Sequence, residues 1–239
     1  MAAKVKVAIP FPPLVEGTLL RRYKRFTADV LIKDGSLITA HTANTGRMTT
    51  CSEPGRKVYL SRSNNPLRKY PYTWELIEMD HGLVGVNTSL PNKLARLALE
   101  KGLIPNCPVG GIIKPEYPLG SSRIDLFYFN NKLKKPSTYI EVKNCTLVES
   151  GVALFPDAVS SRGTRHLLEL METVPENRGI ILILVQRGDA SIFSPADGID
   201  PLWGQTLRKA VEKGVELLVR EVKLSTVEAV LGPPMEVKL

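Results

Sequence analysis

Short alternating runs of apolar and polar residues occupy the first third of the chain, and turn-forming residues separate them. The segments 33–36 (KDGS) and 80–82 (DHG) each lie between two such runs. A period of two residues bounded by Gly, Asp, Asn or Pro is typical of β-hairpins. The pattern predicts strands over residues 28–32, 37–42, 57–61, 73–79 and 83–87. Four or five short strands without a helical period favour a small barrel or sandwich. An oligonucleotide-binding (OB) barrel fits this size, and so do other small barrels.

The pattern changes after Pro91, where Leu94, Leu97 and Ala98 recur at the spacing of one helix face. Three strand-like stretches follow, at residues 111–116, 123–129 and 138–143, and a polar loop over 130–137 joins the last two.

Two further helices are indicated by residues that favour helix starts. Ser160 or Ser161 is placed to cap one of them, and Asp200-Pro201 begins the other, which ends near Gly214. The unbroken apolar run 180–185 predicts a central strand covered on both faces, and a last strand is expected over 215–222.

These elements predict a mixed α/β protein with two domains. Residues 1–88 form the OB-like barrel, and residues 89–239 form an α/β domain with the order helix, three strands, helix, strand, helix, strand.

The composition changes this picture little. The chain has 239 residues, of which 43% are hydrophobic and 23% charged, which excludes disorder or a coiled coil as a description of the whole chain. The longest apolar run, 180–185, is about a third of the length that a membrane helix needs. Residues 1–13 contain three prolines and no apolar core, so we expect a cytoplasmic protein without membrane association. Cys51, Cys107 and Cys145 are odd in number and far apart, which indicates neither a disulfide framework nor a structural zinc site.

The charge is positive and uneven. Lys and Arg outnumber Asp and Glu by 32 to 24, for a net charge of +8, and residues 1–80 carry 13 basic but only 7 acidic side chains. A positive field of this kind favours a polyanionic partner.

The segment 21–26 (RRYKRF) places charge on both faces of any strand, so a bulge or an edge position is needed there. It is either a ridge that follows phosphates, with an aromatic ring to stack on a base, or a solvated edge kept basic to prevent strand pairing. A second basic loop surrounds Pro66. The start of the helix after Ser160 is also basic, and its histidine lies either toward the same cleft or on the surface. The candidate DNA-binding residues are Arg21, Arg22, Tyr23, Lys24, Arg25, Arg62, Arg68, Lys69, Arg162 and His166.

A group of acids and a lysine carries the candidate chemistry. Asp125 lies inside an apolar strand, and Glu141-Val142-Lys143 follows sixteen residues later. Alternation puts Glu141 and Lys143 on one face, about 6.6 Å apart at roughly 3.3 Å per residue. If the two strands pair, Asp125 can face both. Two carboxylates suit Mg²⁺ or Mn²⁺ that keeps several waters, with the Val142 carbonyl as a further ligand. Lys143 would activate water or offset charge during phosphodiester hydrolysis.

The tripeptide Glu-Val-Lys occurs three times, at 141–143, 221–223 and 236–238, so spacing has to decide between the copies. Only the copy at 141–143 comes after a strand that contains an acid, Asp125, with a short loop between the two strands. The alternative interpretation is an ordinary ion pair between Glu141 and Lys143 on an exposed strand, which would contribute little to stability.

Six segments resemble the signature segments of the sugar fermentation stimulation protein family, and the match extends from about residue 14 to residue 219. They are LRRYKRF (20–26), PYTWEL (71–76), VGVNT (84–88), SRID (122–125), EVKN (141–144) and FPDAV (155–159). The resemblance implies an OB barrel followed by a restriction-endonuclease-like domain of the PD-(D/E)xK nuclease fold. It also implies non-specific DNA binding and a role in regulating maltose metabolism, and it places Asp125, Glu141 and Lys143 on the nuclease motif.

We therefore predict a DNA-binding protein with a Mg²⁺- or Mn²⁺-dependent deoxyribonuclease site. One alternative is a non-catalytic DNA-binding regulator of sugar metabolism with a vestigial site, and another is a cleft that binds a small phosphorylated ligand. The sequence leaves open the strand form, the polarity of cleavage, the link to sugar use and the oligomeric state, a homodimer included. It also leaves open whether Glu100 or Glu116 adds a metal ligand.

Overall fold

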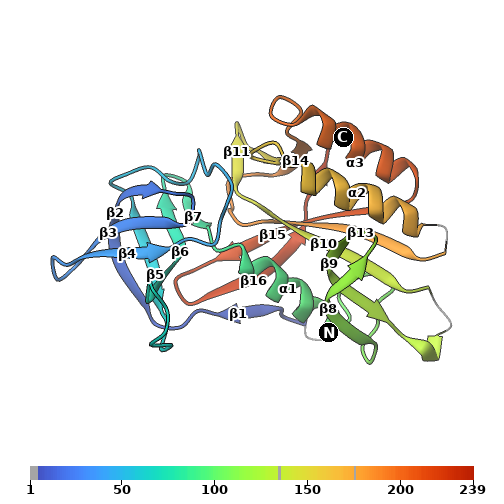
Figure 1. The fold of residues 1–239 in the computed structure, drawn as a ribbon, viewed down its shortest axis with the longest axis horizontal. Helices are drawn as coiled ribbons and strands as arrows, with labels where there is room; N and C mark the ends of the chain where they lie inside the picture. Colours follow the sequence, from blue (N-terminus) through green and yellow to red (C-terminus); the bar gives the residue numbers. More distant parts are fainter. Residues whose placement is uncertain (1–4, 134–135, 175) are drawn as a thin grey trace.

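The computed structural model describes residues 5–133, 136–174 and 176–239. A β-barrel and an α/β domain lie side by side, and the barrel strands are grouped at one end of the molecule (Figure 1). Residues 134 and 135, in the middle of the loop predicted over 130–137, lie outside the described residues; the 3₁₀ turn η1 (Asn131–Leu133) precedes them.

The barrel is a six-stranded sheet in the order β4-β3-β2-β5-β6-β7, and parallel pairing of β4 with β6 closes it as the five-strand barrel of an OB domain. Its buried residues include Leu19, Val30, Val58, Leu60 and Trp74. The five predicted strands and both hairpins are confirmed, as β3 to β7, whereas the ten-residue strand β2 was not predicted. The strands are β2 (Leu14–Tyr23), β3 (Thr27–Ile32), β4 (Leu37–His41), β5 (Lys57–Arg62), β6 (Tyr72–Met79) and β7 (Gly82–Gly85).

A bulge in β2 lies just before the basic segment 21–26, whose charges would otherwise fall on both faces of the strand. The register of β2 against β3 shifts between Leu19 and Arg21, so Leu20 is an extra residue, and it is exposed. The shift turns the following side chains out of the alternation that would have buried charge. The bulge expected in this segment is therefore present.

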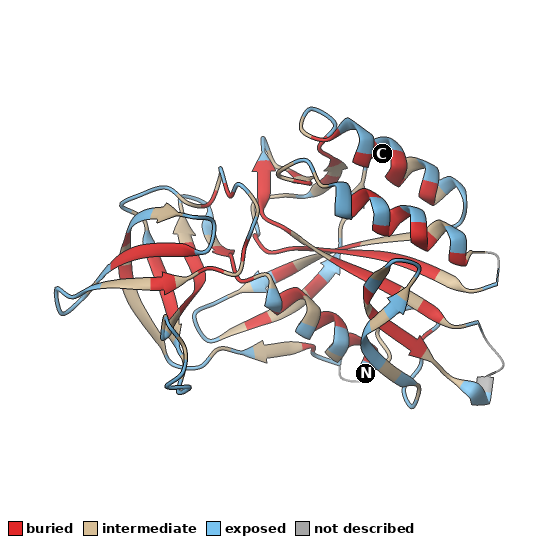
Figure 2. Cartoon of the chain, in the orientation of Figure 1, coloured by how far each residue is buried: buried red, intermediate tan, exposed pale blue. Residues whose placement is uncertain are grey.

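The α/β domain has a seven-stranded mixed sheet in the order β1-β16-β15-β13-β10-β9-β8. The apolar run predicted as a central strand is β13, which pairs in parallel with β10 and β15 and is buried on both faces (Figure 2). The strands are β1 (Ala8–Pro10), β8 (Ile112–Leu119), β9 (Ser122–Phe129), β10 (Thr138–Cys145), β13 (Arg178–Val185), β15 (Glu216–Leu224) and β16 (Glu228–Pro234).

Helices cover both faces of this sheet (Figure 1). α1 (Ser89–Glu100) packs Leu94, Ala98 and Leu99 into the core on one face. α2 (Ser161–Thr173) and α3 (Pro201–Glu212) cover the other face.

The predicted helix caps are present at the starts of α2 and α3. Ser160 Oγ accepts from the Gly163 N–H (3.0 Å), and Asp200 Oδ1 accepts from the Trp203 N–H (3.0 Å). Asp200 Oδ2 also accepts from the Ser160 N–H (2.8 Å). One carboxylate therefore ties the N-termini of both helices together and fixes where α2 begins.

Two features extend the predicted order of elements. β1 pairs antiparallel with β16, so residues 8–10 add a strand to the sheet of the α/β part, while the boundary at residue 88 stays a prediction. A four-stranded sheet also lies beside the main one. Its strands are β11 (Leu147–Glu149), β12 (Val152–Phe155), β14 (Ile192–Pro195) and β17 (Glu236–Val237). Within the described parts of the chain, no helix is long and apolar enough to cross a membrane.

Buried polar contacts join the barrel to the α/β domain. The Gly85 N–H donates to the Gln186 carbonyl (2.9 Å), and Gln186 Nε2 donates to the Gly85 carbonyl (3.0 Å). The Arg187 guanidinium donates to Thr50 Oγ1 (3.1 Å) and to the Thr146 carbonyl (2.8 Å). The ends of β7 and β13 are therefore fixed to each other, which sets the barrel at a defined position beside the sheet.

Candidate active site

Strand β10 carries Glu141 and Lys143 on one face, as alternation predicts. Lys143 Nζ lies 2.5 Å from Glu141 Oε1, and only 3% of the Glu141 surface is exposed. The pair is therefore buried, which excludes the alternative of an ordinary ion pair on an exposed strand. A buried ion pair requires compensation for the hydration that both charges lose, so its presence here needs a further reason.

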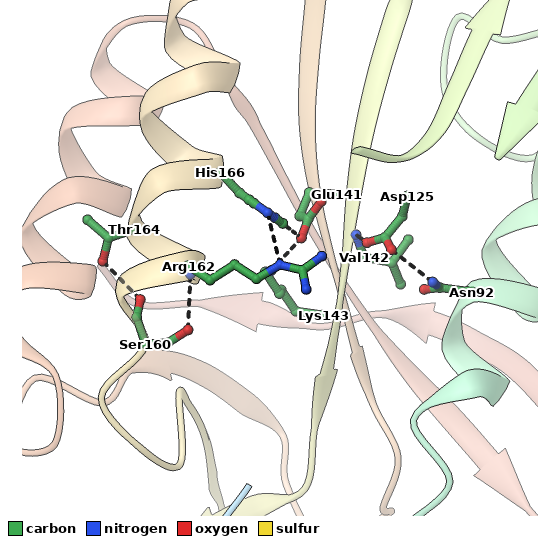
Figure 3. A network of polar contacts seen from close by, with 10 residues as sticks. Asn92, Asp125, Glu141, Val142, Lys143, Ser160, Arg162, Thr164 and His166 are labelled. Carbon is green, nitrogen blue, oxygen red and sulfur yellow. Dashed lines mark hydrogen bonds and ion pairs between the residues drawn. The ribbon is translucent and has the colours of Figure 1, made fainter. Parts of the chain in front are cut away.

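The second partner of Glu141 comes from α2 (Figure 3). His166 is buried, and its Nδ1 makes a short contact with Glu141 Oε1, while its Nε2 accepts from Arg162 Nε (3.3 Å). A neutral ring accepting at Nε2 carries its proton on Nδ1, so His166 donates to Glu141. Burial disfavours the Glu141 charge, but Lys143 and His166 more than offset this, and the pKa of Glu141 lies below its ordinary value.

Asp125 lies just beyond the last paired residues of β9 and β10. The pairing ends at Leu126 and Ile140, and Asp125 Oδ2 accepts from the backbone N–H of Val142 (2.8 Å). Asn92 in α1 donates its side-chain amide to Asp125 Oδ1 (2.9 Å). Burial, together with the nearby Glu141 charge, raises the pKa of Asp125 to about 6.

The protein leaves each of the two carboxylates incompletely stabilised, and the reason differs between them. Glu141 Oε2 is buried and has no hydrogen-bond partner among the described residues, although Oε1 contacts both Lys143 and His166. Asp125 carries a charge that its surroundings disfavour. A divalent cation would satisfy both acids.

The residues present fit a hard cation that keeps most of its water. In the part of the chain that the structure describes, no three His, Cys, Asp or Glu side chains are grouped to enclose a metal ion. Asp125 and Glu141 supply carboxylate oxygens, and Val142 lines the same cavity. Mg²⁺ is commonly bound by one or two carboxylates and retained waters, whereas a closed zinc site needs more protein ligands.

The acids open onto a cavity of about 710 Å³ between the two domains. The barrel contributes Arg22, Arg25 and the loop 44–47. The α/β domain contributes Asn92, Asp125, the segment 141–144, Thr146, the segment 155–160 and Arg162. The candidate site is thus a cleft with one wall from each domain.

The predicted DNA-binding residues fall into different places. Arg22, Arg25 and Arg162 line the cleft, and His166 lies behind Glu141. Arg21 and Tyr23 both contact the Asp29 carboxylate on the barrel surface, at 2.7 and 3.0 Å. Arg62, Arg68 and Lys69 lie together near Tyr70, Tyr72 and Thr73, and, with Lys24, they do not line the cleft. Their binding of DNA stays a prediction.

The sequence reasoning assigned no role to several cleft residues, among them Asn92, Arg47 and Asp157. Asp157 lies in one of the segments that carry the family resemblance, whereas nothing local marks Asn92 or Arg47, because each acquires its place from the packing of segments distant in the sequence. Conversely, Glu100 forms an exposed ion pair with Arg96 (2.9 Å), and neither Glu100 nor Glu116 lines the cleft. The open question of a third acidic ligand from these two positions therefore finds no support.

The fold defines the class: an N-terminal OB domain joined to an α/β domain with an acidic site at their junction. Two family descriptions match the chain, "SfsA N-terminal OB domain" over residues 20–86 and "Sugar fermentation stimulation protein RE domain" over residues 89–228. The chain belongs to the sugar fermentation stimulation protein (SfsA) family.

Curated relatives and a solved structure agree with this assignment. The sugar fermentation stimulation protein homologue of Pelobacter propionicus is 52% identical over 221 residues, which cover 91% of this chain and 94% of the relative. The homologue of Synechocystis is 46% identical over 213 residues, covering 87% and 89%. A structure of SfsA from Pyrococcus furiosus in complex with Ca²⁺ superposes with a TM-score of 0.89 at 28% identity, covering 99% of this chain and all of that chain.

Proposed function

We propose that this protein is a divalent-metal-dependent deoxyribonuclease of the PD-(D/E)xK type that binds DNA without sequence specificity. The observation that carries the proposal is Glu141 Oε2, which is buried beside Asp125 without a hydrogen-bond partner in the described part of the chain, in a cleft that also contains Lys143. An unsatisfied carboxylate oxygen inside a protein is costly, and such atoms are retained where a ligand completes them.

Asp125 and Glu141 would hold Mg²⁺ or Mn²⁺. When bound, the cation supplies Lewis-acid activation of water and neutralises charge on the phosphate. The relative from Pyrococcus furiosus was solved with Ca²⁺, another cation that prefers oxygen ligands. This supports a divalent-cation site in the present chain.

The protein's own residues have separate tasks in this proposal. Lys143 holds its ammonium group beside Glu141 at the cleft surface, where it would offset negative charge that develops on an attacked phosphate. His166 and Lys143 both bind Oε1 of Glu141, so they fix the carboxylate rotamer and leave Oε2 for the cation. Asn92 and the Val142 N–H orient Asp125 in the same way.

The test is an assay of the purified protein on single- and double-stranded DNA with and without Mn²⁺. We expect cleavage that needs the metal and falls about 10²–10³-fold in Lys143→Ala, while DNA binding persists. Lys213→Ala, an exposed lysine outside the cleft, serves as the control. Cleavage that survives in Asp125→Ala would refute the assignment of the site.

The second candidate function is a DNA-binding regulator of sugar metabolism whose nuclease site is vestigial. It is favoured by the small ligand set, because both oxygens of Asp125 already accept hydrogen bonds and the described residues offer no third acid. Under this alternative the protein binds DNA and leaves it intact in Mg²⁺ and in Mn²⁺.

A further inference from the structure

The cleft has two chemically unlike walls. On the barrel side, Arg25 and Arg47 are exposed and line the cavity, and neither forms an ion pair within the described parts of the chain. On the opposite side, the end of β12 and the segment after it place Phe155, Pro156 and Val159 along the cavity. Phe155 is half-buried, Pro156 is buried, and 72% of the Val159 surface is exposed. One wall therefore suits phosphates, and the other suits apolar ring faces.

Arg22 holds the basic wall in shape. Its guanidinium donates to the carbonyls of Arg25 (3.1 Å), Asn44 (2.9 Å), Gly46 (2.9 Å) and Arg47 (3.1 Å). These four bonds join the turn after β2 to the loop 44–47. The charge of Arg22 is thus engaged by backbone oxygens, and the two arginines that it positions keep theirs for a ligand.

The backbone of the basic wall is strained, which supports a role for this wall in binding a ligand. Arg25 has φ of 62°, and Met48, which follows the loop, has φ of 55°. Left-handed conformations are unfavourable for residues with side chains and persist where the surroundings enforce them, often at binding sites.

The basic wall is also fixed relative to the acids. Asp157 Oδ2 accepts from the Met48 N–H (3.1 Å). Gly46 approaches Asp157 so closely that a Cβ at this position would lie 2.3 Å from Oδ2, so any other residue would displace the Asp157 carboxylate. The barrel loop therefore docks directly on the segment that carries the apolar wall, and the spacing of the two walls is preset.

We propose that this cleft takes a single strand of DNA, with phosphates on Arg25 and Arg47 and unpaired bases on Phe155 and Val159. The proposal deepens the proposed function by naming its substrate class, and it rests on that function for the role of the acids. Proteins that bind single strands combine a positive groove for the backbone with apolar or aromatic side chains for the base faces.

A duplex does not use this arrangement. Its base faces are stacked and paired, so the apolar wall would have no partner. The cavity of about 710 Å³ lies in the range of small-ligand pockets, roughly 300–1,000 Å³. A few nucleotides of one strand are ligands of this size, whereas the bases of a duplex are reached only through its grooves.

The first experiment measures binding of a fluorescein-labelled oligothymidylate and of a short hairpin duplex by anisotropy, in EDTA and across a salt series. Arg25→Gln/Arg47→Gln should weaken single-strand binding at least about tenfold. It should also reduce the salt slope by about 1.4, because two contacts at about 0.7 each are lost. The duplex slope should not change. Lys213→Gln/Lys223→Gln removes two exposed charges outside the cleft and should leave both slopes as they are.

The second experiment tests the apolar wall from the substrate side. A strand of abasic residues keeps every phosphate but offers no base, so the wild-type protein should bind it about tenfold more weakly than oligothymidylate. The variant Phe155→Leu/Val159→Ser should narrow this ratio, because it removes the ring and the exposed apolar group. Leucine keeps an apolar contact with Trp203, which Phe155 packs against edge to face, and a thermal melt checks the fold.

Equal losses for single strand and duplex in the arginine variant would overturn the strand preference, and no loss in either would overturn the phosphate contacts. Equal binding of abasic and normal strands by the wild-type protein would overturn the base contacts. All of these measurements are made without metal. Failure of cleavage in Mn²⁺ is therefore a separate result and does not alter their outcome.

Discussion

Each domain buries a glutamate in the middle of a strand, and the two are satisfied in different ways. In the barrel, Glu75 of β6 accepts from Ser61 Oγ (2.6 Å) on one oxygen and from Asn87 Nδ2 (2.8 Å) on the other. In the α/β domain, Glu141 of β10 receives Lys143 and His166 on a single oxygen, and its buried second oxygen has no partner among the residues that the structure describes.

The difference separates a structural carboxylate from one arranged for a ligand. Neutral donors on both oxygens complete Glu75 within the fold. Glu141 is incomplete within the described residues, and its charge is held in place by a neighbouring cation and a buried ring. Burial alone does not distinguish them, because 8% of Glu75 and 3% of Glu141 are exposed. The two glutamates are distinguished by how the hydrogen-bond donors are distributed over the two carboxylate oxygens.

The largest expected effect is that of Glu141→Gln in metal-free protein. Within the described residues, Glu141 is the one anion paired with Lys143, whose side chain is 13% exposed at the edge of the cleft. Loss of one partner of a largely buried pair costs about 3–5 kcal/mol. Urea unfolding in a Trp74→Phe background measures it, because the remaining Trp203 lies in the core of the α/β domain. A loss below about 1 kcal/mol would contradict the buried pair.

Asp125→Asn should have the opposite sign in EDTA. Asp125 has an ordinary pKa of 3.8 that rises to about 6 in the fold, so the folded state binds the proton more tightly than the unfolded chain. Stability is therefore lost as the pH rises from about 4 to about 6, and the full loss of about 3 kcal/mol is present above pH 7. Asparagine does not ionise, so the variant avoids this loss of stability.

The gain of Asp125→Asn should shrink as the pH falls below 6 and approach zero below about pH 3, where the aspartate is protonated in both the folded and the unfolded state. Urea unfolding of both proteins at pH 4.5, 6 and 8 follows this trend. A variant that is less stable than the wild type at pH 8 would show that the Asn92 and Val142 hydrogen bonds outweigh the cost of the charge.

Manganese should stabilise the wild-type protein by about 2.7 kcal/mol at a concentration one hundred times its Kd. Binding relieves the unfavourable Asp125 charge and completes Glu141. The same addition should leave Glu141→Gln and Asp125→Asn nearly unchanged, while Glu75→Gln should respond like the wild type. Thermal melts with and without Mn²⁺ decide this, and equal shifts in all four proteins would place the metal elsewhere.

The strands and helix starts could be predicted because their causes are local. The alternation and turns of the barrel, the caps at Ser160 and Asp200, and the apolar run of β13 are each fixed by a few adjacent residues. The strands β1, β11, β12, β14 and β17 were missed because they span two to four residues, which is too short for a period to be recognised. The longer strands β2 and β16 were missed as well: a bulge interrupts β2 after Leu19, and β16 ends in a glycine and two prolines.

The candidate site was only partly predictable, for a related reason. Alternation along one strand is enough to place Glu141 and Lys143 together, and the composition of β9 singles out Asp125. The roles of Asn92, Arg47 and Asp157 arise where α1, the barrel loop and the segment after β12 meet, and no local pattern encodes that meeting. Arg22 illustrates the limit, because its sequence context predicts a phosphate contact whereas its guanidinium binds four carbonyls.

The smallest expected effect is that of Glu75→Gln, which sharpens the comparison from the barrel side. Glutamine keeps the shape and still accepts one hydrogen bond, and the Ser61 hydroxyl can rotate to accept from the new amide. One buried hydrogen bond is weakened, so we expect a loss of about 1 kcal/mol, measured by urea unfolding in a Trp203→Phe background where Trp74 reports on the barrel. A loss as large as that of Glu141→Gln would mean that the charge of Glu75 is itself required, and the distinction drawn from the two oxygens would fail.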